Sequence, residues 1–206
     1  MRDIPLLLLA ATISAYWTCV GVMVVRIRRK MRHDVGVSPQ QRMERLMWLV
    51  WVPLVVAWIA LPWFALQRTD DPWAVPTSMA PFYGVLRWGA ALAAVGCLAL
   101  TARCWMRMGK DWRMDVSLDS KAALITDGPF QRIRHPIYAF SILLMACSAI
   151  VLPTPTMGFV AVIHIALMNV KARNEERHLL ASHGEAYARY VTHTGRFLPR
   201  FGAHET

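Results

Sequence analysis

Residues 128–138 read GPFQRIRHPIY, and the run that follows, residues 137–152, has no charged side chain. The Gly-Pro pair at the start is typical of a turn. Pro136 suits the first position of a helix, where its missing N–H costs no hydrogen bond. Arg134 and His135 are therefore expected at the N-terminal end of a buried helix. A helix N-terminus and a guanidinium both favour negative charge, so this stretch predicts an anion-binding site.

Arginines beside an apolar helix are also typical topology signals and headgroup anchors, and that interpretation stays open for Arg134. A second polar block favours the binding site. It contains RNEE at residues 173–176, GEAYARY at residues 184–190 and RFLPR at residues 196–200. Only one apolar hairpin separates the two blocks, so we expect them to meet in the folded chain.

Together the two blocks resemble the isoprenylcysteine carboxyl methyltransferase family. The shared pattern is GPFxxIRHPxY, then RxEExxL, then GxxYxxY-x(5)-RFxPR. With a loose GxxW motif at residues 109–112, the resemblance covers residues 109–200. Members of this family are integral-membrane methyltransferases related to the phospholipid N-methyltransferases. The resemblance therefore implies methyl transfer at a membrane, with S-adenosylmethionine as the cofactor.

The composition is that of a membrane protein. Of 206 residues, 56% are hydrophobic and only 17% are charged, whereas soluble domains are roughly one quarter charged. The net charge of +10 is also seen in nucleic-acid-binding proteins, but here the basic residues cluster beside apolar runs, as they do at the cytoplasmic face of a membrane. We expect the lipid bilayer as a partner and no nucleic acid; the oligomeric state stays open.

No metal site is expected. The four cysteines lie in or beside apolar runs without a Cys-x-x-Cys spacing, which is typical of small buried side chains. The seven histidines include no His-x-x-x-His pair. Any cofactor is therefore expected to be organic.

Five apolar segments predict an all-α integral membrane protein with about five transmembrane helices. They are residues 4–25, 46–66, 83–102, 137–152 and 156–170. The first three are long enough to span a hydrocarbon core of about 30 Å. The last two reach only about 24 Å each, so it stays open whether this hairpin crosses the bilayer fully.

The chain is expected to divide into residues 1–102, with three transmembrane helices, and residues 103–206, the methyltransferase core with the hairpin and a cytoplasmic C-terminal segment. A separate amphipathic helix is expected from Glu176 to Tyr190. Arg87, near the start of the third segment, should reach the outer interface or pair inside the bundle.

The distribution of basic residues predicts the orientation. Arginines and lysines crowd residues 26–45 and 103–134, whereas residues 67–81 contain only one. Cytoplasmic loops carry such an excess, so the N-terminus is expected outside and the C-terminus in the cytoplasm, with the protein in a bacterial inner membrane. Both ends of the hairpin then face the cytoplasm. This topology brings residues 134–135 and 175–176 to the same side, where the active site is expected.

Two features inside the apolar runs have competing interpretations. Trp48 and Trp63 are expected at the two interfaces, with Trp51 and Trp58 packed or facing lipid, in preference to an aromatic binding box. His164 is a candidate functional residue because ionisable groups inside membranes usually serve a function. A hydrogen bond to a neighbouring helix would explain His164 equally well.

The resemblance also assigns site residues, because it implies that the RHPxY and EE segments enclose the cofactor together with the tail. The residues expected to contact S-adenosylmethionine are Arg134, His135, Pro136, Tyr138, Glu175, Glu176, Tyr187 and Arg200. Those expected to act in catalysis are Arg134, His135 and Glu176.

Each part of the cofactor suggests a partner. Arg134 and the helix N-terminus can hold the α-carboxylate, and Tyr138 can wall the adenine. One of the two adjacent glutamates can accept from the ribose hydroxyls or pair with the α-ammonium. Adjacent helical residues point about 100° apart, so only one should enter the pocket. Asn169, Arg173 and Glu176 share a face, and Glu176 is therefore expected to be that residue.

The sequence departs from the family pattern at two positions. Phe140 stands where a glycine commonly follows HPxY, and Gly195 stands where a proline is usual before RFxPR. Phe140 is expected to narrow the path from the bilayer. The expected acceptor is therefore a small or lipid-like thiol or carboxylate, ahead of an amine. His135, with a reference pKa near 6.5, is the natural base for a thiol or an amine.

Three other functions stay open. A phospholipid N-methyltransferase would share the cofactor. The sterol reductases have a similar membrane core with RHPxY and use NADPH, but they generally have more helices than this chain can supply. A non-enzymatic protein on the same scaffold is the third alternative.

The orientation can be tested with reporter fusions placed after Asp71 and at Thr206. Because the two positions are expected on opposite sides of the membrane, a periplasm-active reporter should be active only at the first and a cytoplasm-active reporter only at the second. Matching signals at the two positions would contradict the predicted topology.

Overall fold

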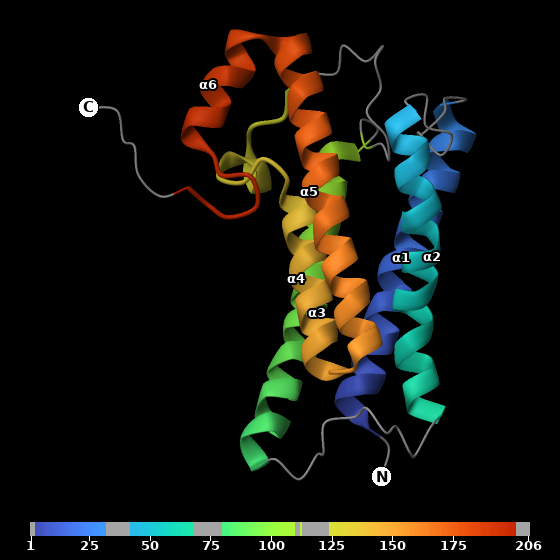
Figure 1. Ribbon diagram of the computed structural model, residues 1–206. Coiled ribbons are helices and arrows are strands. Elements are labelled where there is room, and N and C mark those ends of the chain that lie inside the picture. Colours follow the sequence, from blue (N-terminus) through green and yellow to red (C-terminus); the bar gives the residue numbers. More distant parts are fainter. Residues whose placement is uncertain (1–2, 32–41, 68–79, 110–111, 113–123, 201–206) are drawn as a thin grey trace.

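The computed structural model describes residues 3–31, 42–67, 80–109, 112 and 124–200. These residues form a bundle of helices (Figure 1), so the predicted all-α class is confirmed. The helices are α1 (Ile4–Met31), α2 (Arg42–Gln67), α3 (Ala80–Met108), the 3-10 helix η2 (Gly128–Gln131), α4 (Pro136–Val151), α5 (Pro155–His183) and α6 (Glu185–His193). Four of them, α1, α2, α3 and α5, are long and apolar enough to cross a membrane, and α4 is apolar but shorter.

The ends of α4 and α5 follow from local sequence. Pro136 occupies the first turn of α4, as expected. The hydroxyl of Thr154 caps α5 by accepting a hydrogen bond from the backbone N–H of Met157 at 3.2 Å. Gly184, with φ of 51°, ends α5 because a positive φ is easily adopted only by glycine.

Helix α5 is longer than predicted. The sequence led us to expect an arm that ends at Val170 and a separate helix from Glu176 to Tyr190, but α5 runs without a break to His183. The reason is that residues 159–183 contain no glycine or proline. The change from apolar to charged residues marks where the helix leaves the hydrocarbon and not where it ends. At 29 residues α5 is about 43 Å long, so its C-terminal part stands clear of a core about 30 Å thick.

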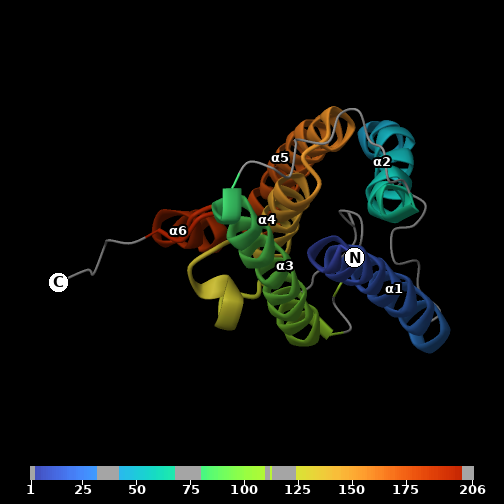
Figure 2. The same ribbon diagram turned by 90° about the horizontal axis from the view of Figure 1, so that it is seen from below.

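The five long helices form a ring. Helix α4 packs along α3 on one side and α5 on the other, α5 packs against α2, α2 against α1, and α1 against α3. Figure 2 shows this order from one end of the bundle, with the α1–α2 pair set apart from the α3–α4–α5 layer. Helix α6 and the segment after it lie beside the C-terminal end of α5 (Figure 1).

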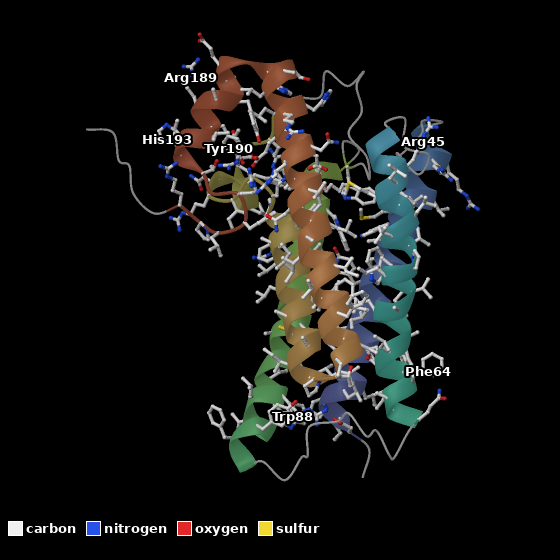
Figure 3. All side chains as sticks on the ribbon, in the orientation of Figure 1. Arg45, Phe64, Trp88, Arg189, Tyr190 and His193 are labelled. Atoms are coloured by element: carbon white, nitrogen blue, oxygen red, sulfur yellow. The ribbon has the colours of Figure 1, made fainter. Side chains whose placement is uncertain are left out.

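Small side chains allow the close packing of α3. Ala90, Ala91 and Ala94 are buried in the core, and small residues of this kind let helix backbones approach closely. Across from them, Leu144 and Met145 of α4 are fully buried. By contrast, apolar side chains on the outer faces of the bundle are exposed, among them Phe64 and Trp88 (Figure 3). That distribution fits a surface in contact with lipid tails.

Polar side chains inside the bundle are paired between helices. The indole N–H of Trp58, which is fully buried, donates to the Ser148 hydroxyl at 3.0 Å. Arg87 of α3 forms an ion pair with Asp3 at 2.5 Å and also donates to the carbonyl oxygen of Val151 at 3.2 Å. Arg87 is therefore paired, at the end of the bundle where α1 begins and α4 ends, and this position agrees with both interpretations of the residue.

Candidate functional site

The RHP stretch is held in place by the chain segment that follows α6. The backbone N–H of Gly195 donates to the carbonyl of Arg132 at 3.0 Å, and the N–H of Arg134 donates to the carbonyl of Gly195 at 2.8 Å. The N–H of His135 donates to the carbonyl of Arg196 at 3.1 Å. These bonds form a short parallel bridge between Ile133 and Gly195. The two polar motifs thus meet through their backbones, as expected from the sequence.

This bridge explains one departure from the family pattern. A Cβ atom on Gly195 would lie 1.8 Å from the carbonyl oxygen of Leu198, far inside van der Waals contact. The N–H of Gly195 is also a hydrogen-bond donor in the bridge, and proline has no N–H to donate. The approach of Leu198 therefore excludes any side chain at this position, and the hydrogen bond to Arg132 excludes proline in addition.

Glu176 lies at the centre of an ion-pair cluster. It accepts from Nε of Arg134 at 3.0 Å, and from Nε and Nη2 of Arg196 at 3.0 and 2.5 Å. Arg134 also donates to the carbonyl oxygens of Val191, at 3.3 Å, and Thr194. The three charged side chains thus tie α5 to the RHP stretch and to the segment after α6. Arg196 was missed in our sequence-based selection, although it opens the RFLPR motif.

His135 lies between two carboxylates. Its Nδ1 is 3.4 Å from Glu175 and its Nε2 is 3.5 Å from Glu176. The ring stacks on Tyr138, with centroids 5.4 Å apart and planes 7° from parallel. Burial alone would lower the pKa of His135, but the two carboxylates raise it above its usual value. His135 is thus held close to both carboxylates, and its predicted role as a base stays a prediction.

A cavity of about 310 Å³ adjoins the cluster. One stripe of α5 lines it, with residues three or four positions apart, as expected for a single helix face. The stripe contains His164, Met168, Lys171, Glu175, His178 and Ser182. The wall therefore carries Glu175, whereas Glu176 points to the arginines. The expectation that Glu176 would enter the pocket is corrected: Asn169, Arg173 and Glu176 do share a face, but a different one.

The half of the cavity nearest the cluster is polar. Arg134, His135, Tyr138, Glu175 and Tyr187 all line it. The hydroxyl of Tyr138 donates to Glu175. Tyr187 is buried and its hydroxyl has no hydrogen-bond partner. Burial and the charge of Glu176 raise the pKa of Tyr187, so its hydroxyl stays protonated and can donate to a ligand.

Helix α6 contributes a second tyrosine to this half. Tyr190 lines the cavity and donates to the carbonyl of Phe130 at 2.5 Å. In Figure 3, Tyr190 lies on the side of α6 that faces α5, whereas Arg189 and His193 lie on its outer side. The gap of three residues between Tyr187 and Tyr190 therefore places both rings on the inner face of α6.

The other half of the cavity lies among the membrane-spanning helices and is aromatic. Trp17 of α1, Trp48 and Trp51 of α2, and Trp105 of α3 line it. Trp112, the last residue of the GxxW motif, is buried and also lines the cavity. Trp48 was expected at an interface and Trp51 packed or facing lipid, in preference to an aromatic binding box. Trp51 does pack on Trp17, but the position of both residues on the cavity wall was not predicted. Their spacing of three residues was the available signal, because it places both on one helix face.

The predicted site residues divide into two groups. Six of the eight expected cofactor contacts line the cavity: Arg134, His135, Pro136, Tyr138, Glu175 and Tyr187. Glu176 lies behind them in the ion-pair cluster, and Arg200 is exposed and does not line the cavity. The roles of these residues toward a cofactor stay predictions.

Phe140 does not narrow the cavity. It lines a separate surface hollow together with Leu100, Arg103 and the Gly128-Pro129 turn. This hollow is lined by residues of α3 and η2, so Phe140 lies toward those two elements. The size argument against a bulky acceptor therefore has no support from this residue.

Comparison with known proteins gives one family and two relatives. Residues 85–186 match the family model described as phospholipid methyltransferase. The chain is 26% identical over 157 residues to the nickel-cobalt-cadmium resistance protein NccN of Alcaligenes xylosoxydans xylosoxydans, covering 72% of each chain. It is 29% identical over 172 residues to the cobalt-zinc-cadmium resistance protein CzcN of Cupriavidus metallidurans, covering 82% of this chain and 65% of that protein.

Replacing Gly195 with alanine should release the segment after α6 from the RHP stretch. The added Cβ would overlap the Leu198 carbonyl, and overpacking of this kind typically costs about 1–3 kcal/mol. We expect a lower thermal midpoint and faster proteolysis after α6. Gly158→Ala is the matched control, because nothing lies within 4 Å of a Cβ there. Equal behaviour of the two variants would contradict the role assigned to the bridge.

The position of His135 between two carboxylates predicts a pH-dependent stability. Because the folded pKa of His135 is raised, its charge stabilises the fold fully below the unfolded pKa of about 6.5, and this contribution is lost as the pH rises through the folded pKa. The free energy of unfolding should therefore fall from pH 6 to pH 9. His135→Gln should remove much of that slope, and His193→Gln, at an exposed position, should keep it. The measurement is thermal unfolding in detergent at each pH.

Proposed function

We propose that this chain is an S-adenosylmethionine-dependent methyltransferase with its site at the cytoplasmic side of an inner membrane. Through residues 85–186 it belongs to the superfamily of membrane methyltransferases that includes the phospholipid and isoprenylcysteine enzymes. The family match, which covers both α4 and α5, supports methyl transfer over NADPH-dependent reduction. The observation that carries the proposal is the polar half of the cavity, where the two motifs meet.

The residues of this half suit the cofactor. S-adenosylmethionine has an α-carboxylate, an α-ammonium, a ribose diol and an adenine. The first turn of α4 offers the N–H group of Ile137, which has no acceptor within the helix at this position, and Ile137 lines the cavity. This group and Arg134 would hold the carboxylate. The carboxylate of Glu175 would pair with the ammonium or accept from the ribose, and the unpartnered Tyr187 hydroxyl would donate.

The remaining groups keep that arrangement rigid. Glu176, held by two arginines, fixes the register of α5 and therefore the position of Glu175. His135 lies against both carboxylates and stacks on Tyr138, so it orients Glu175 and the first turn of α4 together. When bound, S-adenosylmethionine supplies a methyl group on a sulfonium, which is already a good leaving group. The protein's contribution is then mainly alignment and the exclusion of water.

The acceptor is proposed to be a small or lipid-like thiol or carboxylate. It would occupy the aromatic half of the cavity, which lies among membrane-spanning helices. No carboxylate of the described residues lines that half, so an ammonium group would have no counter-ion there. The names of both relatives refer to metal resistance, and thiols are soft metal ligands, which further supports a thiol. The second candidate is a phospholipid amine, favoured by the description of the matching family.

Binding of S-adenosylmethionine should depend on Glu175 and Tyr187. Losing a charge-assisted contact costs about 1.5–3 kcal/mol, so Glu175→Gln should weaken binding about ten- to a hundredfold. Tyr187→Phe removes a hydroxyl that has no protein partner, so it should weaken binding without lowering the thermal midpoint. Isothermal titration calorimetry of purified protein measures both.

Two controls make this experiment decisive. Arg132→Gln, at an exposed side chain that does not line the cavity, should leave the affinity unchanged. NADPH should give no heat of binding. Unchanged affinity in folded Glu175→Gln and Tyr187→Phe would show that the cofactor lies elsewhere, and binding of NADPH instead of S-adenosylmethionine would overturn the proposed activity.

A further inference from the structure

Two polar side chains line the aromatic half of the cavity together with its tryptophans. The tryptophans are Trp17, Trp48, Trp51 and Trp105, and the polar residues are Ser141 of α4 and His164 of α5. Trp17 packs edge-to-face on Trp51, with ring centroids 5.2 Å apart, so the walls form a continuous aromatic surface. We call this half, bounded by these six residues, the acceptor chamber.

Only one of the two ring nitrogens of His164 has a hydrogen-bond partner. Its Nε2 is hydrogen-bonded to the Ser141 hydroxyl at 3.0 Å, and its ring packs on Trp58 of α2 with centroids 5.0 Å apart. The predicted hydrogen bond to a neighbouring helix is therefore present. The side chain is only 1% exposed, yet its Nδ1 has no hydrogen-bond partner. A buried polar atom without a partner is costly, and because His164 lines the chamber, a ligand there can satisfy it.

Trp17 gives a second indication of a ligand. Its indole N–H is buried without a hydrogen-bond partner, and the residue lines the same chamber. An indole N–H can only donate. The chamber thus presents one donor and one imidazole nitrogen in an otherwise apolar, aromatic space, which matches a molecule with an apolar body and a single small polar head.

We propose that the acceptor chamber binds a thiol with an apolar, aromatic body, and that His164, not His135, takes the proton from its sulfur. This inference rests on the proposed methyltransferase activity and assigns its acceptor and its base. Both ring nitrogens of His135 lie within 3.5 Å of a carboxylate oxygen, although its Nε2 makes no hydrogen bond. Nδ1 of His164 has no hydrogen-bond partner and lies beside the aromatic half of the cavity, where the acceptor is proposed to bind.

The proposal requires one tautomer of His164. In it the Ser141 hydroxyl accepts from Nε2–H of His164 across their 3.0 Å hydrogen bond, which leaves the lone pair on Nδ1. The S–H bond of the acceptor breaks and its proton moves to Nδ1. The sulfur forms a bond to the methyl carbon as the methyl–sulfonium bond of S-adenosylmethionine breaks. The products are a methyl thioether, S-adenosylhomocysteine and a proton that leaves from His164.

Binding to the chamber can be measured without turnover. The probes are 4-bromobenzyl mercaptan, 4-bromophenylacetate and 4-bromobenzylamine, which share a bromophenyl body and differ in the head. Bromine quenches tryptophan fluorescence on contact, and four tryptophans form the walls. The mercaptan should quench the tryptophan fluorescence of the wild-type protein in nanodiscs. His164→Leu keeps an apolar side chain in the chamber but removes the polar atoms, so the same degree of quenching should require at least tenfold more mercaptan. Val162→Leu, at an exposed position of α5, should behave as wild type.

Turnover then tests the base. With labelled S-adenosylmethionine, His164→Gln should lower methylation of the mercaptan by about 10²–10⁴-fold, because general-base catalysis contributes that much. The glutamine amide keeps an N–H for Ser141 but has no basic nitrogen. Methylation of 4-bromophenylacetate, a carboxylate that needs no base, should change by less than tenfold. Calorimetry should show unchanged cofactor affinity in both His164 variants.

Each of the other outcomes would contradict one part of the proposal. A wild-type protein that shows no quenching by the mercaptan would exclude the chamber as the thiol site. A bound mercaptan that is not methylated, or is methylated equally by His164→Gln, would exclude His164 as the base. Methylation of the benzylamine alone would replace the thiol with an amine. Quenching by the mercaptan without any binding of S-adenosylmethionine would instead reject the proposed methyltransferase activity.

Discussion

The site depends on the pairing of Glu176 with two arginines. An ion pair that is largely removed from water is stable only when its geometry satisfies both charges, because desolvation is costly. Glu176 meets this condition with three hydrogen bonds from Arg134 and Arg196. The pairing fixes α5 against two segments that are far apart in the chain. Every other feature of the polar half, including the position of His135 between the carboxylates, requires that alignment.

The continuity of α5 lets one helix serve two purposes. Adjacent residues on a helix point about 100° apart, so Glu175 faces the cavity while Glu176 faces the arginines. Farther along the same helix, His164 belongs to the stripe of Glu175 and lines the aromatic half. One continuous helix therefore connects the polar half of the cavity with the half that lies among the membrane-spanning helices, and no loop has to place these groups.

The sequence was sufficient to predict what depends on apolar length and on motif order. It predicted the helical bundle, the start of α4 at Pro136, and the meeting of the RHP stretch with the EE segment. It was not sufficient for features that depend on helix phase and tertiary packing. Which glutamate faces the cavity follows from how α5 packs on α4 and α2, and the same packing puts Trp48 and Trp51 on the cavity wall. The need for glycine at position 195 arises only from the approach of Leu198, which no local pattern reveals.

The bridge at Gly195 has a consequence for biosynthesis. Its segment follows all the described membrane-spanning helices in the chain, and proteins are synthesised and folded from the N-terminus. Helices α1 to α5 therefore enter the membrane before Arg196 is available to pair with Glu176. Until then, the carboxylates at the end of α5 face water or lipid headgroups. The ion-pair cluster is thus completed only after the last segment of the described chain has been synthesised, later than the helices that this segment joins.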